Sequence, residues 1–407
     1  MPILYYYTCY HVFAKEISSM KRYTAAIVGC GSIGNAHMEG YNLVDEVEVI
    51  AVADPVPMAR KTYVDAYGIP QEFETVEEMM ERARPDIVSV CTWHLLHPAP
   101  TIAAAAGGAR AVICEKPMAI GMAAADSMVD ACEAHGTQLV ISHQRRFTPG
   151  WEKAKALVEE GAIGAPIFVT NKVADGLTNW GTHSIDGSRF VLGDPRAQWV
   201  MGAVERRTDR YERDTMIEDA CMGLVHFAGD LQLFIQSDLM REGAGAGCFE
   251  IRGSEGLLSV SETRLQIMNP SSGGWRDVDL ALTEGSKAIG GNTNAAQVRE
   301  LLACLEGHKA EHRNAGTTAR DTVEIMMALY ESARRNRAIH LPLQEKGYPL
   351  QLMVEEGGLP VEVEGRYDIR GFLKREGIDE AKYKKLSDEG MGHHQIMRQL
   401  HDEMNPR

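Results

Sequence analysis

Residues 25–34 read Ala-Ala-Ile-Val-Gly-Cys-Gly-Ser-Ile-Gly, an apolar run followed by three glycines in the spacing G-x-G-x-x-G. Glycines at this spacing permit a tight turn after a strand, let backbone N–H groups approach a pyrophosphate, and let the next helix pack closely. The phosphates would lie at the positive N-terminus of that helix. The stretch therefore predicts a dinucleotide-binding turn whose cofactor contacts come from Gly29, Gly31, Ser32, Ile33 and Gly34.

An acidic residue follows at the distance that a dinucleotide site requires. The apolar stretch 47–53 ends in Asp54, twenty residues beyond Gly34. A carboxylate there accepts hydrogen bonds from both hydroxyls of the adenosine ribose and repels a 2′-phosphate. We therefore predict NAD as the cofactor in preference to NADP, although Arg60 can still form part of a phosphate site. The plainer alternative is that Asp54 only caps the following helix.

Composition and charge narrow the class of protein. The 407 residues are 44% apolar and 24% charged, which is typical of a globular protein with room for two domains. The formal net charge of −15 argues against nucleic acid or an anionic membrane surface as a partner. Residues 1–22 lack both a basic leader and an apolar stretch long enough for a signal peptide or a membrane span.

Cysteine usage predicts a reducing environment. Eight cysteines are scattered without a C-x-x-C pair, and several lie in apolar, strand-like runs. This usage is typical of reduced, buried thiols in a cytoplasmic protein. His393 and His394 lack a cysteine or an acid at ligand spacing, so we expect no metal site.

The first part of the chain alternates between strand-like and helical patterns. Strands are expected at 25–29, 47–53, 86–91, 110–114 and 137–142, with helices from 32 and at 56–67, 75–83, 98–106 and 121–135. Such alternation predicts an α/β fold with a doubly wound parallel sheet, a Rossmann domain. Right-handed crossovers place the carboxyl ends of the strands along one edge, and with them Gly29, Asp54, Thr92 and Lys116.

After a helix at 149–160 the pattern changes to longer strand-like runs, at 167–174, 198–206, 218–227, 231–237, 248–252 and 257–261. These predict a second α/β domain with a large, open, mostly antiparallel sheet, in which Ala228-Gly229-Asp230 links two strands as a hairpin. We divide the chain into an N-terminal extension (1–22), a Rossmann dinucleotide-binding domain (23–147), a substrate-binding and oligomerisation domain (148–342) and a C-terminal extension (343–407).

Two features bear on assembly. Apolar alternation at Leu231, Leu233 and Ile235 on an open sheet needs cover, so we expect a homodimer or homotetramer. The charged C-terminal extension either wraps a neighbouring subunit or forms a solvated tail.

Several landmarks in order give a resemblance to a known family. They are the glycine loop at 29–34, the Val-Ala-Asp strand end at 52–54, Thr92 to His97, Glu115-Lys116-Pro117, Gly161 to Pro166, and Gly181 to Asp186. Together they resemble the Gfo/Idh/MocA sugar oxidoreductases over roughly residues 23–342. The resemblance implies a Rossmann domain joined to an open α/β domain, with a carbohydrate bound between them over the nicotinamide.

The resemblance makes Lys116 the first candidate for catalysis, because the lysine of Glu-Lys-Pro lies beside the nicotinamide in similar proteins. A partly desolvated ammonium stabilises an alkoxide, and its pKa can fall far enough for it to relay a proton. By the same resemblance, Thr92, His94, His97 and Glu115 are expected to contact the cofactor.

His183 is the expected general base, and Asp186 shares its helix face and can orient nearby groups. Similar proteins usually carry an aspartate four residues before this histidine, where this chain has Asn179. Asparagine can hydrogen-bond a sugar hydroxyl but cannot hold a negative charge. Either Lys116 and His183 suffice, with Asn179 positioning the substrate, or Asp175 or Asp186 substitutes.

Further substrate contacts are expected near the domain boundary. Trp93 replaces the usual proline after Thr92 and can offer an aromatic face to a sugar ring. His143 and Arg146 lie where similar chains place substrate-facing polar residues, and Arg145 or Arg146 can bind a uronate carboxylate. An interdomain ion pair explains the arginines equally well.

These residues predict an NAD-dependent oxidoreductase that oxidises a secondary hydroxyl of a sugar, inositol or glycoside. One alternative is glycoside cleavage by oxidation, elimination and rereduction, with recycling of the NAD. The other is a non-catalytic dinucleotide or sugar sensor. Net NADH formation, release of an aglycone without it, and binding without turnover distinguish the three.

Overall fold

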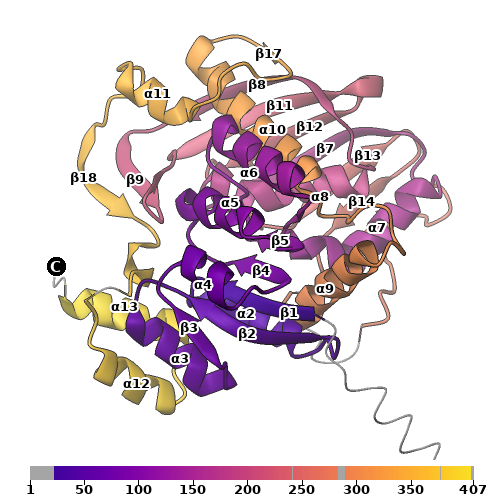
Figure 1. The fold of residues 1–407 in the computed structure, drawn as a ribbon. Coiled ribbons are helices and arrows are strands. Elements are labelled where there is room, and N and C mark those ends of the chain that lie inside the picture. The colour runs from indigo at the N-terminus through magenta and orange to yellow at the C-terminus, as the bar shows by residue number, and fades with distance from the viewer. Residues whose placement is uncertain (1–22, 241, 283–288, 376, 405–407) are drawn as a thin grey trace, which may run out of the picture.

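The computed structural model describes residues 23–240, 242–282, 289–375 and 377–404, so the N-terminal extension lies outside the described residues. Within these ranges, six parallel strands form one sheet in the order β3-β2-β1-β4-β5-β6. The strands are β1 (Tyr23–Val28), β2 (Val47–Ala53), β3 (Gln71–Phe73), β4 (Ile87–Val90), β5 (Ala111–Cys114) and β6 (Gln138–Ile141). The predicted Rossmann domain is confirmed (Figure 1).

Helices cover both faces of this parallel sheet: α2 (Ser32–Tyr41), α3 (Pro57–Tyr67), α4 (Val76–Arg82), α5 (Pro98–Ala106) and α6 (Met122–His135). All residues of β4 and β5 are buried, as expected for strands covered on both sides. Strand β3 was not predicted, because Gln-Glu-Phe is short and has a single apolar residue. It adds at the edge of the sheet beside β2.

In the described part of the second domain, nine strands form a large sheet in the order β16-β15-β14-β13-β7-β12-β11-β8-β17. Strands β7 and β12 pair in parallel and the other neighbours pair antiparallel, so the predicted mostly antiparallel sheet is confirmed. The strands are β7 (Pro166–Val173), β8 (Ala197–Glu205), β11 (Ala220–Phe227), β12 (Gln232–Ser237), β13 (Phe249–Gly253), β14 (Leu257–Val260), β15 (Leu265–Met268), β16 (Arg276–Asp277) and β17 (Ile339–His340). The expected hairpin at Ala228–Asp230 joins β11 to β12.

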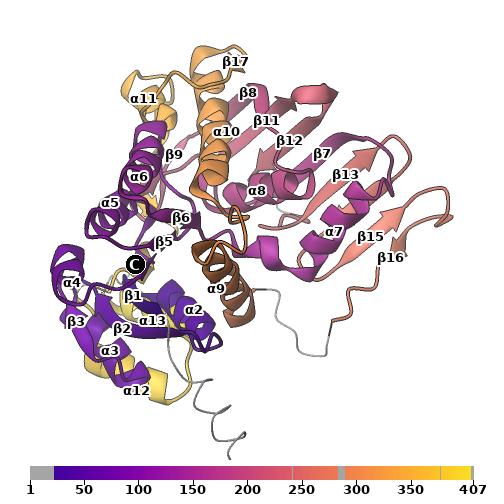
Figure 2. The same ribbon diagram turned by 45° about the vertical axis from the view of Figure 1, so that its right-hand side comes forward.

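Helices α7 (Pro149–Glu159), α8 (Thr182–Val191) and α10 (Gly316–Arg335) pack against one face of the large sheet (Figure 2). Helix α9 (Gly291–Leu305) instead returns to the Rossmann domain and packs against α2. There Asn294 Nδ2 donates to the carbonyl of Ala36 at 2.8 Å. The chain therefore crosses between the two domains more than once.

The described part of the C-terminal extension also contacts both domains. It contains α11 (Pro349–Glu355), β18 (Val363–Asp368), α12 (Glu380–Asp388) and α13 (His393–Met404). Strand β18 pairs in parallel with β9 (Thr208–Glu212), and β9 pairs with β10 (Thr215–Met216), which makes a small three-stranded sheet among the described residues. Farther on, α12 lies beside α3 (Figures 1 and 2), and just before α12 Arg375 Nη2 donates to Thr62 Oγ1 of α3 at 3.2 Å.

The expectation that Leu231, Leu233 and Ile235 need cover from another subunit is wrong. Their side chains are 8%, 0% and 0% exposed and lie in the core of the single chain. They point to the face of the large sheet that the helices cover, whereas Met201 and Met222 are exposed on the other face. The sequence correctly predicted that these three side chains are buried, but they are covered by helices of the same chain and not by another subunit.

Three further findings concern the described residues. All seven of their cysteines are free and, apart from the partly buried Cys248, buried; Cys9 lies outside these residues. No helix in this part of the chain is long and apolar enough to cross a membrane. No group of three or more His, Cys, Asp or Glu side chains there is arranged to hold a metal ion.

Candidate active site

The glycine loop joins β1 to α2 at the carboxyl edge of the parallel sheet. Gly29 has a φ of +94°, and a Cβ there would lie 2.9 Å from the backbone carbonyl of Cys91. A Cβ on Gly34 would lie 2.5 Å from the Tyr63 hydroxyl. At Gly31, by contrast, a Cβ would meet no described atom within 4 Å. Two glycines thus permit packing and the third leaves open space at the helix N-terminus, which fits a pyrophosphate.

Asp54 follows β2 and is tied to this loop. Its Oδ2 accepts from the Cys30 N–H and its Oδ1 from the Val56 N–H, both at 2.8 Å. Each carboxylate oxygen has two lone pairs, so both remain able to accept from a ribose hydroxyl. Arg60 Nη1 donates to the Asp54 carbonyl at 2.6 Å, which directs this guanidinium to the backbone.

Lys116 lies two residues beyond the end of β5 and is partly buried. Its Nζ donates to the carbonyl of Asn179 at 3.5 Å, across the domain boundary. Burial lowers the pKa of Lys116 to about 8; the charges of Arg213 and Arg145 lower it too, against Glu115 and Glu212. An amine with this pKa exchanges protons near neutral pH, as a proton-transferring group must.

Two predicted cofactor residues support the strand ends around Lys116. The carboxylate of Glu115 accepts from the Lys116 N–H at 3.2 Å and lies 3.0 Å from His37 Nε2, inside the domain. The ring nitrogens of His97 lie 2.9 Å from the Pro117 carbonyl and 3.1 Å from the Thr92 carbonyl. His97 therefore bridges the ends of β4 and β5.

His183 lies in the first turn of α8, and its ring is buried. Arg145 Nη1 donates to His183 Nε2 at 2.8 Å, while Arg145 Nε donates to Glu262 at 2.7 Å. Burial, then Arg145 and Lys116, lower the pKa of His183 well below its usual range, so the ring is neutral. Because a guanidinium only donates, the ring proton is on Nδ1. The general-base role stays a prediction, and it requires Arg145 to release Nε2.

The neighbouring Arg146 has different contacts. Its guanidinium binds Asp186 through two hydrogen bonds of 2.8 and 2.7 Å and Asp194 through two of 2.9 and 2.7 Å. His143 Nδ1 lies 3.2 Å from Asp186 Oδ1, and burial lowers the pKa of His143 to about 4. Arg146 and Asp186, both predicted to contact the substrate, thus form a buried ion pair between η2 (Gln144–Phe147) and α8, with the neutral His143 beside it, whereas Arg145 faces His183.

Trp93 and His94 contact segments from far along the chain. The Nζ of Lys374, in the C-terminal extension, lies 5.7 Å from the centre of the partly buried Trp93 ring. His94 Nε2 lies 2.5 Å from Thr215 Oγ1 and 3.6 Å from Glu212 Oε2. Burial lowers the pKa of His94 well below its usual range, which leaves this ring neutral too.

Sequence reasoning missed Glu212 and Arg213 altogether. They lie on the hairpin of β9 and β10, whose turn residues Arg213 and Asp214 have φ values of +48° and +62°. Asp368 of the extension accepts from the N–H groups of Arg213 at 3.0 Å and Asp214 at 2.7 Å. The charged triplet at 212–214 could have marked a turn, but no local signal indicates that this turn reaches Lys116.

Several residues of the candidate site have polar atoms without a partner. Among the described residues, the buried side-chain atoms that have no hydrogen-bond partner include Thr92 Oγ1, Asn179 Nδ2, His183 Nδ1 and Glu212 Oε2. Buried polar groups in folded proteins are almost always paired, so these four atoms are free to pair with a bound ligand. The four include donors and acceptors, and they come from both domains.

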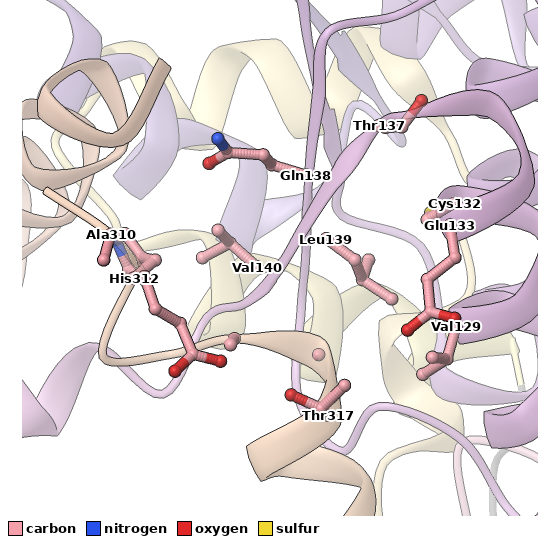
Figure 3. Close-up of a pocket in the computed structure, with 13 residues that line it drawn as sticks. Val129, Cys132, Glu133, Thr137, Gln138, Leu139, Val140, Ala310, His312 and Thr317 are labelled. Carbon is pink, nitrogen blue, oxygen red and sulfur yellow. The ribbon is translucent and has the colours of Figure 1, made fainter. Parts of the chain in front are cut away.

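The pocket in Figure 3 lies elsewhere. It is formed by the carboxyl end of α6, the amino end of β6 and the segment that leads into α10, and Val129, Gln138, His312 and Thr317 are among its lining residues. The candidate-site residues of the Rossmann domain follow the carboxyl ends of the strands, at the opposite edge of the sheet. The pocket therefore contributes nothing to the site.

Comparisons with known proteins agree with the fold. Residues 23–143 match the profile of a family described as oxidoreductases with an NAD-binding Rossmann fold. The chain is 26% identical to D-apiose dehydrogenase of Paraburkholderia graminis, over 86% of this chain and 97% of that protein. It is 29% identical to an inositol 2-dehydrogenase of Burkholderia cenocepacia, over 42% and 55%. The aldose–aldose oxidoreductase of Caulobacter crescentus, crystallised with glycerol, has the same fold, with a TM-score of 0.68 and 22% identity over 79% of this chain and all of that one.

Proposed function

From the premise that residues 23–143 belong to the Gfo/Idh/MocA oxidoreductase family, we propose that the protein is an NAD-dependent dehydrogenase of carbohydrates. The reaction is the oxidation of a secondary hydroxyl group of a sugar, inositol or glycoside. One observation carries the proposal: Lys116, a lysine with a pKa of about 8, lies at the same edge of the parallel sheet as the glycine loop and contacts Asn179, whose Nδ2 has no partner. Names of relatives, a D-apiose dehydrogenase and an inositol 2-dehydrogenase, support the carbohydrate class.

In this proposal the Rossmann domain holds NAD, which supplies the hydride acceptor. The open space at Gly31 and the N-terminus of α2 receive the pyrophosphate, and Asp54 accepts from the ribose hydroxyls. The Asp54 carboxylate repels a 2′-phosphate, and Arg60 is directed to a backbone carbonyl. These features favour NAD over NADP.

Lys116 handles the proton of the reacting hydroxyl. As an amine it accepts this proton, and as an ammonium it stabilises the alkoxide that forms when hydride leaves. With a pKa of about 8, the amine fraction of Lys116 grows as the pH rises towards that value. The rate of oxidation should therefore increase with pH over this range, and the rate of the reverse reduction should decrease.

The remaining orphan atoms recognise the other hydroxyls of the substrate. Asn179 Nδ2 and the Nδ1–H of His183 are donors, and the Thr92 hydroxyl can donate or accept. A carbohydrate presents several hydroxyls that both donate and accept, which suits such a mixed set of polar atoms. An apolar substrate would leave them unpaired at a cost of about 1–3 kcal/mol each.

The proposal is tested by the absorbance of reduced nicotinamide. Purified protein is mixed with NAD, or with NADP in parallel, and a panel of free sugars, inositols, uronates and glycosides. A rise with NAD and one carbohydrate class is the expected result. Aglycone release without a rise would support NAD-recycling cleavage, and NAD binding without any turnover would support a sensor; either result would refute a net dehydrogenase.

We also propose that the protein is a homodimer or homotetramer built on the open face of the large sheet. Met201 and Met222, on neighbouring strands of this face, are 52% and 44% exposed. Apolar side chains on a wide exposed sheet favour a subunit contact. Light scattering should give a multiple of the 44.8 kDa chain mass, and Met222→Glu should shift it towards the monomer.

A further inference from the structure

We propose that Glu212 is a positioning residue of this reaction, which supplies from the second domain the negative charge that Asn179 does not supply opposite Lys116. The inference rests on the proposed function, because it assigns a part in that reaction. It starts from the orphan oxygen of Glu212. Within the described residues, Oε2 of Glu212 is the one buried carboxylate oxygen without a hydrogen-bond partner.

The other carboxylates near the site are already engaged. Asp186 binds Arg146 and His143, and Glu262 accepts from Arg145. Glu115 is fixed by His37 inside the Rossmann domain. Asp175 lies 3.4 Å from Arg370 at the edge of the extension. Neither acid that could replace the missing aspartate, Asp175 or Asp186, therefore has the free, buried oxygen that Glu212 has.

The hairpin of β9 and β10 brings Glu212 across the domain boundary. The side chain is 0% exposed, and its Oε2 lies 3.6 Å from His94 Nε2 on the Rossmann side. Its other oxygen, Oε1, accepts from Arg213. The hydrogen bonds from the Arg213 and Asp214 N–H groups to Asp368 hold the turn in place. A carboxylate held this way keeps a fixed position when a substrate binds.

The charges around the two groups come from both domains. Lys116 is faced by Glu115, His94, His143, Arg145, His183, Glu212 and Arg213. Glu212 is faced by Arg213, Lys116, Arg370, Asp368 and His94. The histidines are neutral, so the cations Arg213 and Arg145 act on Lys116 against the anions Glu115 and Glu212. When the Glu212 charge is removed, Glu115 alone offsets the effect of the two arginines on the pKa of Lys116.

Loss of the Glu212 charge should lower the pKa of Lys116. Burial, Arg213 and Arg145 lower the pKa of Lys116, whereas Glu115 and Glu212 raise it. In Glu212→Gln the pKa of Lys116 should fall further, by about one pH unit for a neighbouring charge in a partly buried site. Substrate oxidation, which needs the amine, should then begin at a pH about one unit lower.

The experiment measures Lys116 itself, with a readout that needs no turnover. Wild type and Glu212→Gln are exposed at each pH to a brief pulse of acetic anhydride, and acetylation of the Lys116 peptide is quantified by mass spectrometry. The midpoint of the labelling curve should lie lower in Glu212→Gln by about one pH unit. The pH dependence of kcat, measured with whichever carbohydrate the substrate panel identifies, should move in the same direction.

Glu218→Gln is the matched control. Glu218 is also a buried glutamate, but its oxygens accept from the Leu177 N–H and the Tyr330 hydroxyl, both at 2.6 Å. Its replacement should lower the melting temperature and leave the Lys116 midpoint unchanged. Asp368→Ala, which releases the hairpin turn and retains Glu212, should shift the midpoint down by less than Glu212→Gln does.

The outcomes separate this inference from the proposed function. Equal midpoints in wild type and Glu212→Gln, or an equal shift in Glu218→Gln, would overturn the role of Glu212 even if the enzyme oxidises a sugar. If Glu212→Gln does not fold, an unchanged midpoint in Asp368→Ala would overturn it. A shifted midpoint in a protein that oxidises no carbohydrate would instead refute the dehydrogenase and leave the coupling of Glu212 to Lys116 standing.

Discussion

The two ends of the proposed dinucleotide site are built in different ways. At the adenosine end, the glycine loop at 29–34 and Asp54 are near one another in sequence, and Asp54 holds the loop through the Cys30 N–H. At the reacting end, Lys116 meets side chains that lie up to about a hundred residues away, among them His183 and Glu212. The residues proposed to bind the adenosine end of NAD thus lie close together in sequence. The reacting centre, by contrast, depends on how the two domains and the C-terminal extension pack together.

The largest expected effect isolates the reacting end. Lys116→Ala should lower kcat by about a thousandfold, because it removes the proton-transferring group. The dissociation constant of NAD, measured by quenching of protein fluorescence, should change little, since the glycine loop and Asp54 are intact. Turnover near the wild-type rate would remove Lys116 from the mechanism, and an equal loss of NAD binding would show that the two ends are not separable.

The next test compares two adjacent arginines within the reacting end. Arg146→Met should destabilise the fold by about 3–5 kcal/mol, because it leaves Asp186 as an unpaired buried charge. Arg145→Met should leave the free energy of unfolding almost unchanged, since Arg145 pairs with Glu262 in a partly exposed position. Urea unfolding of the two variants makes the measurement.

The same pair separates stability from chemistry. Arg145 lowers the pKa of His183 and occupies its Nε2, so Arg145→Met should raise that pKa and free a lone pair. The pH profile of kcat should then change in Arg145→Met. Equal stability losses in both variants would contradict the assignment of Arg146 to the framework and Arg145 to the site.

These residues show how far sequence reasoning reaches. The strand–turn–helix at 23–41 was predictable, because apolar spacing and glycine stereochemistry act within a few residues. The sequence could not predict that Arg146, and not Arg145, binds Asp186. Both arginines belong to one short 3-10 turn, and their directions depend on where α8 lies. Glu212 was out of reach for the same reason, since its hairpin belongs to the other domain.

A smaller effect tests the adenosine end. Gly31→Ala should leave the melting temperature unchanged, because a Cβ there meets no described atom within 4 Å, yet it should weaken NAD binding about tenfold by filling the space of the pyrophosphate. Gly29→Ala is the contrasting variant: its φ of +94° and the contact with Cys91 should destabilise the fold itself. Unchanged NAD affinity in Gly31→Ala would place the pyrophosphate elsewhere.

The smallest expected effect tests whether NAD binding at the adenosine end depends only on residues that are near one another in sequence. Arg375 of the extension donates to Thr62 on α3 and to Glu380, and Asp54 is among the anions that act on its charge. In Arg375→Ala the extension loses this contact with α3, and NAD binding should weaken about threefold, as expected for a partly exposed charge. Titration of NAD against wild type and variant makes the measurement.

Arg398→Ala controls for general loosening of the extension. Arg398 is exposed, and its guanidinium lies 4.1 Å from the centre of the Phe372 ring, which belongs to the apolar cluster formed with α12 and α13. Arg398 has no described contact with α3. If both variants bind NAD like the wild type, the adenosine end is specified by residues 29–54 alone, and the contrast with the reacting end is complete. If only Arg375→Ala weakens NAD binding, the extension takes part at both ends of the site. The two ends then differ only in degree, because each needs a residue that folding brings from far along the chain.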